Sequence, residues 1–249
     1  MSVAASARVE TGFLDRVVNV AGKDYHYQVY VPMNFGSQKS WPVILFLHGS
    51  GERGSDGLLQ TDVGLPHAIR QNSSRFPFVV VIPQCSQNIT WGAPEMREQA
   101  LAALDRSIKE FHGDRRRVYV TGLSMGGYGT WDFAVAEPHR FAALVPICSG
   151  VSAPNDWPEL RVRLPADAKD ADPYAEVARR IGKTPVWIFH GDADDAVPVE
   201  EARHMAAALK AAGADYKYTE YPGVGHNSWE KAYADLDLVL WLLSKSLSH

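Results

Sequence analysis

A serine stands between glycines in the segment Gly122-Leu123-Ser124-Met125-Gly126-Gly127. The segment follows a short apolar run, Val118–Thr121, and precedes a stretch with helical spacing, Tyr128–Glu137. This is the setting of a G-x-S-x-G elbow, in which the flanking glycines let a strand and a helix approach closely. The sharp turn would lift the Ser124 hydroxyl above the strand end, towards the N-terminal amides of the helix. The alternative is a glycine-rich turn with an idle serine, but the flanking pattern favours a nucleophile.

A serine hydroxyl is a weak nucleophile unless a base accepts its proton and a third group orients the base. Among nine histidines, His226 stands out because it follows a strand-like run, Tyr216–Tyr221, and a glycine-containing turn, and because a helix follows it. We expect His226 to be the base, the alternative being a histidine that caps the helix. His48 and His190 end other strands beside glycines, and we expect them to bond the loops that follow.

Three carboxylates compete for the role of the orienting acid. Asp192, Asp194 and Asp195 all lie in the loop after the apolar run Val186–Phe189, and this loop precedes His226 in the chain. The order serine, acid, histidine suits a hydrolase built on parallel strands. Spacing alone does not choose among the three. Asp192 could instead fix the turn through a side-chain hydrogen bond, and Asp195 could be a solvated surface residue.

A second glycine-rich loop, Gly49–Gly54, follows the apolar run Val43–Leu47 and fits the dinucleotide-binding pattern G-x-G-x-x-G. A dinucleotide site requires a helix that begins directly after the loop and an acidic residue about 20 positions later. Neither is present, since more loop follows and the distant residues are Ile69-Arg70-Gln71-Asn72. The loop suits another task, which is to aim a backbone N–H at the serine. Together with the N–H of Met125, it would form an oxyanion hole.

These residues need a scaffold, and the apolar runs predict one. Continuous apolar runs indicate strands buried on both faces, as in a parallel sheet covered by helices. Helical spacing marks Glu95–Phe111, Val199–Ala212 and Trp229–Leu243. The alternation predicts a doubly wound, mostly parallel α/β sheet. It would begin with an antiparallel hairpin and consist of the runs Asp15–Val20, Tyr25–Val31, Val43–Leu47, Phe78–Ile82, Val118–Thr121, Leu144–Ile147, Val186–Phe189 and Tyr216–Tyr221.

Composition narrows the classes of function. The 249 residues carry 25 Lys and Arg against 29 Asp and Glu, a formal net charge of −4. We therefore expect no nucleic-acid partner, and no apolar run of about 18 residues predicts a membrane span. No ligand spacing suggests a metal, and we expect no cofactor. Cys85 and Cys148 are expected to be buried free thiols, a single disulfide being the alternative. The first ten residues do not resemble a signal peptide, and the compartment and oligomeric state stay open.

Together, Leu47–Gly54 and Gly122–Trp131 resemble the α/β-hydrolase superfamily of serine esterases, in its carboxylesterase/phospholipase branch. Feruloyl-esterase-like proteins and some predicted peptidases belong to the same branch. The resemblance covers the chain from about Tyr25 to the C-terminal helix. It implies an α/β-hydrolase fold with little or no cap and one catalytic domain over residues 1–249.

The resemblance also implies roles for two residues that spacing leaves open. In this branch the acid takes the fifth place of an H-G-x-x-D-x-x-V-P pattern, which falls on Asp194 within His190–Pro198. The oxyanion residue follows the His-Gly pair, which places it at Ser50. One departure is Asp195, where relatives often have proline.

The expected activity is that of a serine carboxylesterase acting on short acyl or aryl esters, free or pendant from a polymer. Between Cys148 and Thr184 the chain is too short for a lipase cap, so we expect an open cleft, with Trp91, Trp157 and Trp229 as candidates to line it. The alternatives are a feruloyl or acetyl-xylan esterase, a peptidase on the same scaffold, and a non-catalytic binding module. Peptidases of this kind usually carry a gating domain. The run Arg115-Arg116-Arg117 is expected to be a solvated turn before a strand.

Overall fold

The computed structural model describes residues 10–154, 156–168 and 171–247. One sheet runs through this part of the chain, with its strands in the order β1-β2-β4-β3-β5-β6-β7-β8. The pairings β1–β2 and β2–β4 are antiparallel and the others are parallel. The strands are β1 (Gly12–Val20), β2 (Lys23–Val31), β3 (Trp41–Leu47), β4 (Val79–Pro83), β5 (Gly113–Leu123), β6 (Ala143–Ile147), β7 (Val186–Gly191) and β8 (Tyr216–Tyr221).

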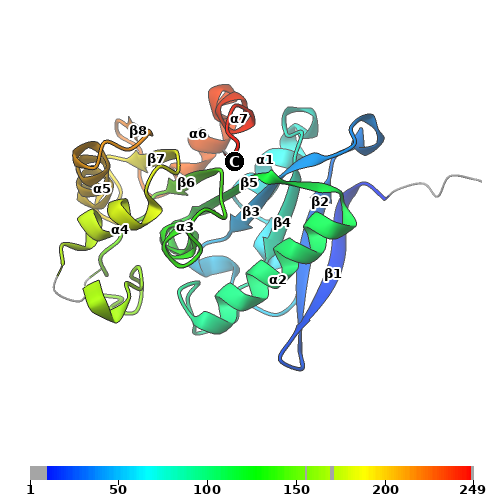
Figure 1. Cartoon of the computed structure of the whole chain (residues 1–249), viewed down its shortest axis with the longest axis horizontal. Helices are drawn as coiled ribbons and strands as arrows, with labels where there is room; N and C mark the ends of the chain where they lie inside the picture. The colour runs from blue at the N-terminus through cyan, green and yellow to red at the C-terminus, as the bar shows by residue number, and fades with distance from the viewer. Residues whose placement is uncertain (1–9, 155, 169–170, 248–249) are drawn as a thin grey trace, which may run out of the picture.

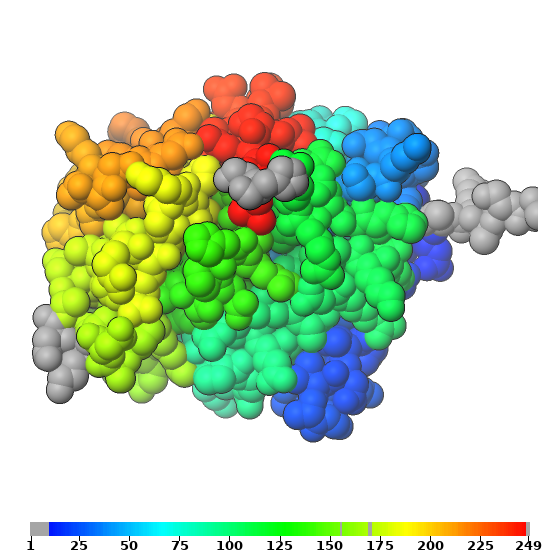
Figure 2. Space-filling model, in the orientation of Figure 1, coloured from blue at the N-terminus to red at the C-terminus, as the bar shows by residue number. Residues whose placement is uncertain are grey.

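Helices cover both faces of this sheet (Figure 1). One face packs against α2, α3, α4 and α5, and the other against α1, α6 and α7. In the space-filling view of the same orientation, α2, α3 and the segments around α4 hide the central strands (Figure 2). The helices are α1 (Leu65–Gln71), α2 (Pro94–Glu110), α3 (Met125–Ala136), α4 (Pro173–Ile181), α5 (Val199–Ala211), α6 (Trp229–Ala234) and α7 (Leu236–Leu243).

Strand β3 shows why the apolar runs are continuous. Successive side chains of a strand point to opposite faces of the sheet. Val43 and Leu45 accordingly belong to the core on the α2–α3 side, whereas Ile44 and Phe46 belong to the core on the α6–α7 side. All four are buried. The predicted doubly wound α/β sheet with an antiparallel start is confirmed.

Two local predictions are wrong. The stretch Trp229–Leu243 is two helices, because Asp235 adopts an extended backbone and its side chain accepts the N–H of Asp237, which starts α7. The three arginines at Arg115–Arg117 belong to β5 rather than to a turn before it. The first two of them are exposed at the start of that strand, where Arg115 pairs with Asp105.

Both cysteines are buried free thiols, as expected from the sequence. Across the described ranges, no helix combines the length and the apolar character needed to cross a membrane.

Candidate active site

The Ser124 turn joins β5 to α3 with no intervening loop. Ser124 itself has a φ of 52° and a ψ of −121°, a strained conformation for a residue with a side chain. The neighbouring glycines make the turn possible. A Cβ at Gly126 would overlap the carbonyl oxygen of Leu47 on β3, and one at Gly122 would overlap the Gly126 carbonyl. The predicted elbow is therefore present, and its glycines are required because any side chain at these positions would overlap the neighbouring backbone.

Three side chains from separate loops form a continuous hydrogen-bonded chain. His226 Nε2 lies 2.9 Å from Ser124 Oγ, and His226 Nδ1 lies 2.8 Å from Asp194 Oδ2. A carboxylate only accepts hydrogen bonds, so Nδ1 carries the imidazole proton. Nε2 is then free to accept a hydrogen bond from the Ser124 hydroxyl. The structure thus brings together Ser124, His226 and Asp194, which are far apart in the sequence.

Asp194 is the one of the three candidate acids that faces His226. Its side chain is fully buried. Asp192 instead accepts the N–H of Gly223 at 2.6 Å and joins the two loops, while Asp195 is exposed.

The carboxylate of Asp194 receives several donors. Burial raises its pKa, but bonds from His190, His226 and the Val197 N–H outweigh burial and hold the pKa well below its usual range. The backbone N–H groups of Ala196 and Val197 each reach Oδ1 at 2.9 Å. An acid in these surroundings stays ionised at neutral pH.

His190 is a contact to the acid that the sequence-based interpretation missed. Its ring is buried, and Nε2 lies 2.9 Å from the Val197 carbonyl, the expected loop bond, and also 3.2 Å from Asp194 Oδ2. The available signal was the H-G-x-x-D spacing, which puts histidine and acid at opposite ends of one tight turn.

The predicted oxyanion residue Ser50 begins a short 3₁₀ turn, Ser50–Glu52, which follows the end of β3 after two residues. Ser50 and Met125 are each the first residue of a helical segment, where the N–H has no partner within that segment. Among the described residues, neither N–H donates to another acceptor. Both amides are therefore available to a ligand.

His48 supports the peptide that carries the Ser50 N–H. Burial lowers the pKa of His48 to about 4, so its ring is neutral. Nε2 accepts the Cys85 N–H at 2.9 Å, which leaves the proton on Nδ1, 2.6 Å from the Gly49 carbonyl. That carbonyl belongs to the same peptide unit as the Ser50 N–H. His48 therefore fixes and polarises the donor peptide.

Cys148 lies beneath the serine at the end of β6. Its Sγ accepts the Ser124 N–H at 3.3 Å. Burial raises the pKa of the Cys148 thiol well above its usual range. This thiol is a neutral packing group that supports the elbow.

Comparison with known proteins identifies the family. Residues 88–244, more than half of the chain, match the prolyl oligopeptidase family. The chain belongs to this family. Its fold is the α/β-hydrolase fold.

Relatives of this prolyl oligopeptidase family member include both peptidases and esterases. An uncharacterised peptidase of Bacillus subtilis is 33% identical over 52% of this chain, and a bifunctional acetylxylan esterase/xylanase of Neocallimastix patriciarum is 27% identical over 73%. The crystal structure of a thermostable esterase matches 94% of this chain with 31% identity and a TM-score of 0.77. The chain spans 22%, 23% and 63% of the lengths of these proteins, in that order.

The three tryptophans occupy different positions in this family member. Trp91 is fully buried, donates its indole N–H to the His48 carbonyl and packs edge-on against the His48 ring, so the expectation that it lines the cleft is wrong. Trp229 is half-buried, and its ring centre lies 5.6 Å from that of His226. Trp157 is half-buried, and its ring lies under the guanidinium of Arg53.

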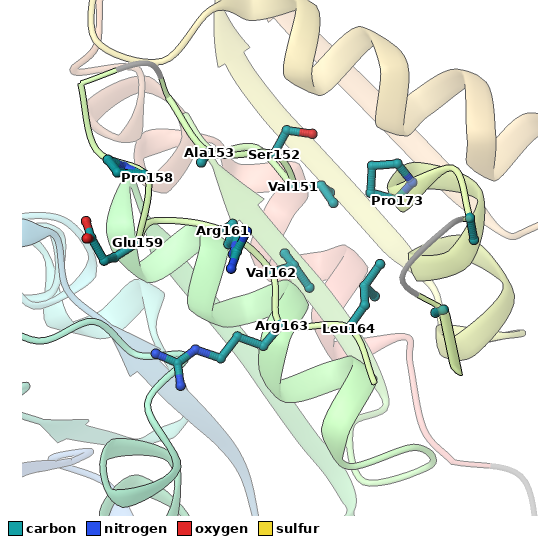
Figure 3. A pocket seen from close by; sticks show the side chains of 12 residues that line it. Val151, Ser152, Ala153, Pro158, Glu159, Arg161, Val162, Arg163, Leu164 and Pro173 are labelled. Atoms are coloured by element: carbon teal, nitrogen blue, oxygen red, sulfur yellow. The ribbon is translucent and has the colours of Figure 1, made fainter. Parts of the chain in front are cut away.

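A cavity of about 950 Å³ opens between the segment after β6 and the start of α4. Figure 3 shows apolar side chains at one end and the charged Glu159, Arg161 and Arg163 towards the other. Ser124 and His226 do not line it. The cavity is therefore separate from the contacts of Ser124, His226 and Asp194. In the described ranges, no group of three or more His, Cys, Asp or Glu is placed to hold a metal ion.

Proposed function

We propose that this chain is a serine esterase that hydrolyses short acyl or aryl esters, free or pendant from a polymer. The observation that carries the proposal is the unbroken chain of contacts from Ser124 Oγ through the His226 ring to Asp194, at 2.9 and 2.8 Å. Esterases among the similar proteins support ester rather than amide chemistry.

Acylation begins when His226 Nε2 takes the Ser124 proton as Oγ attacks the ester carbonyl carbon. The carbonyl π electrons move to oxygen, and the N–H groups of Ser50 and Met125 hold the resulting oxyanion. When the C–O bond to the alcohol breaks, the His226 imidazolium protonates the leaving oxygen. Asp194 keeps the ring in place and stabilises its positive charge throughout.

Deacylation repeats these steps with water. His226 removes a proton from water, the oxygen attacks the acyl carbon, and the same two amides hold the second oxyanion. Collapse breaks the bond to Ser124 Oγ, which regains its proton from His226 and releases the acid. Trp229, beside the His226 ring, would contact the substrate near the leaving group.

Removing the nucleophile tests the proposal. Ser124→Ala should lower kcat for 4-nitrophenyl butyrate by about 10⁴-fold or more, because no acyl-enzyme can form, while leaving thermal unfolding unchanged. Ser55→Ala, an exposed serine in the loop after β3, is the matched control and should keep wild-type turnover. A fluorophosphonate probe should label the wild type and not the Ser124 variant. Near-wild-type hydrolysis by Ser124→Ala would refute the proposal, and absence of labelling would favour a binding module.

A peptidase is the second candidate, favoured by the family match and by the Bacillus relative. Amide hydrolysis would use the same residues, with His226 protonating an amine. Rates for an aminoacyl 4-nitroanilide and for the matching ester separate the two. Because serine peptidases also cleave the more reactive ester faster, the amide decides: we expect no turnover of the nitroanilide above background, and measurable turnover would identify a peptidase. An acetylated xylan and a feruloylated sugar, assayed alongside, test the polymer-ester form of the proposal.

A further inference from the structure

Arg53 is built into the turn that presents the proposed oxyanion donor. It directly follows the 3₁₀ turn Ser50–Glu52, and its Nε donates to the Ser50 carbonyl at 3.0 Å. The Arg53 carbonyl in turn accepts the Gln87 side-chain amide at 2.6 Å. The guanidinium is therefore held beside the residue whose N–H would contact the ester carbonyl.

Trp157 reaches the same place from a distant part of the chain. It belongs to the segment between β6 and α4, and its ring centre lies 5.2 Å from Arg53 Cζ. An arginine stacked on an indole keeps its planar edge free for hydrogen bonding while the ring restricts its motion. The two side chains, about a hundred residues apart in the chain, form one amphipathic wall next to Ser50.

The edge of this guanidinium has no protein partner in the described ranges. No carboxylate there lies within 4.0 Å of Arg53, and Nε makes the one side-chain hydrogen bond of this residue. Two acidic residues are close in sequence. Glu52 points under the turn, with Oε2 3.2 Å from the place of a Cβ on Gly49, and Asp156 is exposed beside Trp157. Neither neutralises the charge of Arg53.

We propose that Arg53 and Trp157 form a subsite for a carboxylate carried by the ester substrate a few bonds from the scissile carbonyl. The inference rests on the proposed esterase function and names its substrate class. A guanidinium fork pairs with a carboxylate through two N–H groups, and a half-buried, anchored fork does so better than a mobile surface arginine. The indole supplies a face for the chain that links the carboxylate to the ester.

The subsite also has room for a larger acid. Pro158, the residue after Trp157, lines the cavity of about 950 Å³, and Arg161 and Arg163 lie in it as well (Figure 3). The positive charges of these two arginines favour an anionic substrate, and the negative charge of Glu159 at the same end offsets part of that effect.

Paired substrates test the subsite. The ratio of kcat/KM for 4-nitrophenyl hemisuccinate to that for 4-nitrophenyl valerate measures preference for a carboxylate in the acyl part. The ratio for 4-acetoxybenzoate to its methyl ester measures the same preference in the alcohol part. We expect at least one ratio to exceed 1 in the wild type and to fall about tenfold in Arg53→Gln, the amount that a charge-assisted hydrogen bond typically contributes. The ratio cancels any general damage to the oxyanion turn.

Two further variants complete the test. Trp157→Ala should lower the same ratio, and Trp157→Phe should retain most of it, because a phenyl ring still stacks on the guanidinium. Arg115→Gln, an exposed arginine at the opposite end of β5, is the control and should leave every ratio unchanged. Two results would overturn the subsite: both ratios at or below 1 in the wild type, or ratios that do not change in Arg53→Gln. In either case, turnover of the valerate ester would still support an esterase. If the wild type did not hydrolyse the valerate ester at all, that result would instead contradict the proposed function itself.

Discussion

The carboxylate of Asp194 accepts hydrogen bonds on both oxygens. His226 approaches Oδ2 from the loop after β8 and His190 from the end of β7, and the backbone amides of Ala196 and Val197 occupy Oδ1. A group surrounded by donors cannot rotate without losing a bond. This arrangement explains how an acid on a loop can orient a histidine that itself sits on another loop.

At this scale we predict sharply unequal effects in the three-aspartate loop. In Asp194→Asn the amide NH₂ must face a donor, so His226 loses its orientation, and kcat should fall about 10³- to 10⁴-fold, as for other triads. Asp195→Asn should change kcat less than about twofold, because Asp195 is exposed. Asp192→Asn keeps an oxygen for the Gly223 N–H and should also be mild. Steady-state kinetics on one nitrophenyl ester measure all three, and a large loss at Asp195 would contradict the assignment.

At the scale of the elements, four strand ends carry the site. β3 is followed by Ser50, β5 by Ser124, β7 by Asp194 and β8 by His226. Because β3, β5, β6, β7 and β8 are parallel, their carboxyl ends lie at one edge, and side chains far apart in sequence meet there.

The strands and the elbow could be predicted from the sequence because they depend on local patterns, namely apolar runs and glycine spacing. Other features depend on tertiary contacts. Trp91 is buried because its indole finds the His48 carbonyl and ring, which lie on another strand end. The contact of His190 with Asp194 depends on the path of the turn between them. The break between α6 and α7 at Asp235 depends on one capping hydrogen bond. No periodicity signals such contacts.

The close approach of β3 to the elbow gives a prediction for Gly126. In Gly126→Ala the methyl group would overlap the Leu47 carbonyl, a backbone atom of the central sheet that cannot move away cheaply. Overpacking of this kind costs about 3 kcal/mol or more when the neighbour is backbone. We therefore expect a lower free energy of unfolding in urea and loss of esterase activity. Gly36→Ala, where nothing lies within 4 Å of the added atom, is the control and should remain within about 0.5 kcal/mol of the wild type.

At the scale of the whole molecule, two acids, the half-buried Glu201 and the buried Asp132, attach the segment after β6 to the body of the fold. Glu201 on α5 accepts the N–H groups of Val151 and Ser152 at 2.8 and 3.1 Å. Asp132 on α3 accepts the Arg163 N–H at 2.9 Å and contacts Arg97 at 3.3 Å. The segment that carries Trp157 is thus fixed at both ends by carboxylates on helices of one face.

Asp132 makes this attachment dependent on pH. Burial raises its pKa to about 6, although the Arg163 N–H and the charge of Arg97 act in the opposite direction. A carboxyl whose pKa is higher in the folded than in the unfolded protein binds more protons when folded. Its contribution therefore falls as pH rises from about 4 to about 6, by roughly 3 kcal/mol for a shift of about two units.

Comparing Asp132→Asn with the wild type isolates that contribution. The asparagine oxygen still accepts the Arg163 N–H, but the side chain no longer titrates. In urea unfolding at a series of pH values, the wild type should lose stability relative to the variant between pH 4 and pH 6.5. The difference between the two should then level off at higher pH. A constant difference across this range would show that Asp132 titrates at the same pH in the folded and unfolded protein, and would contradict the prediction.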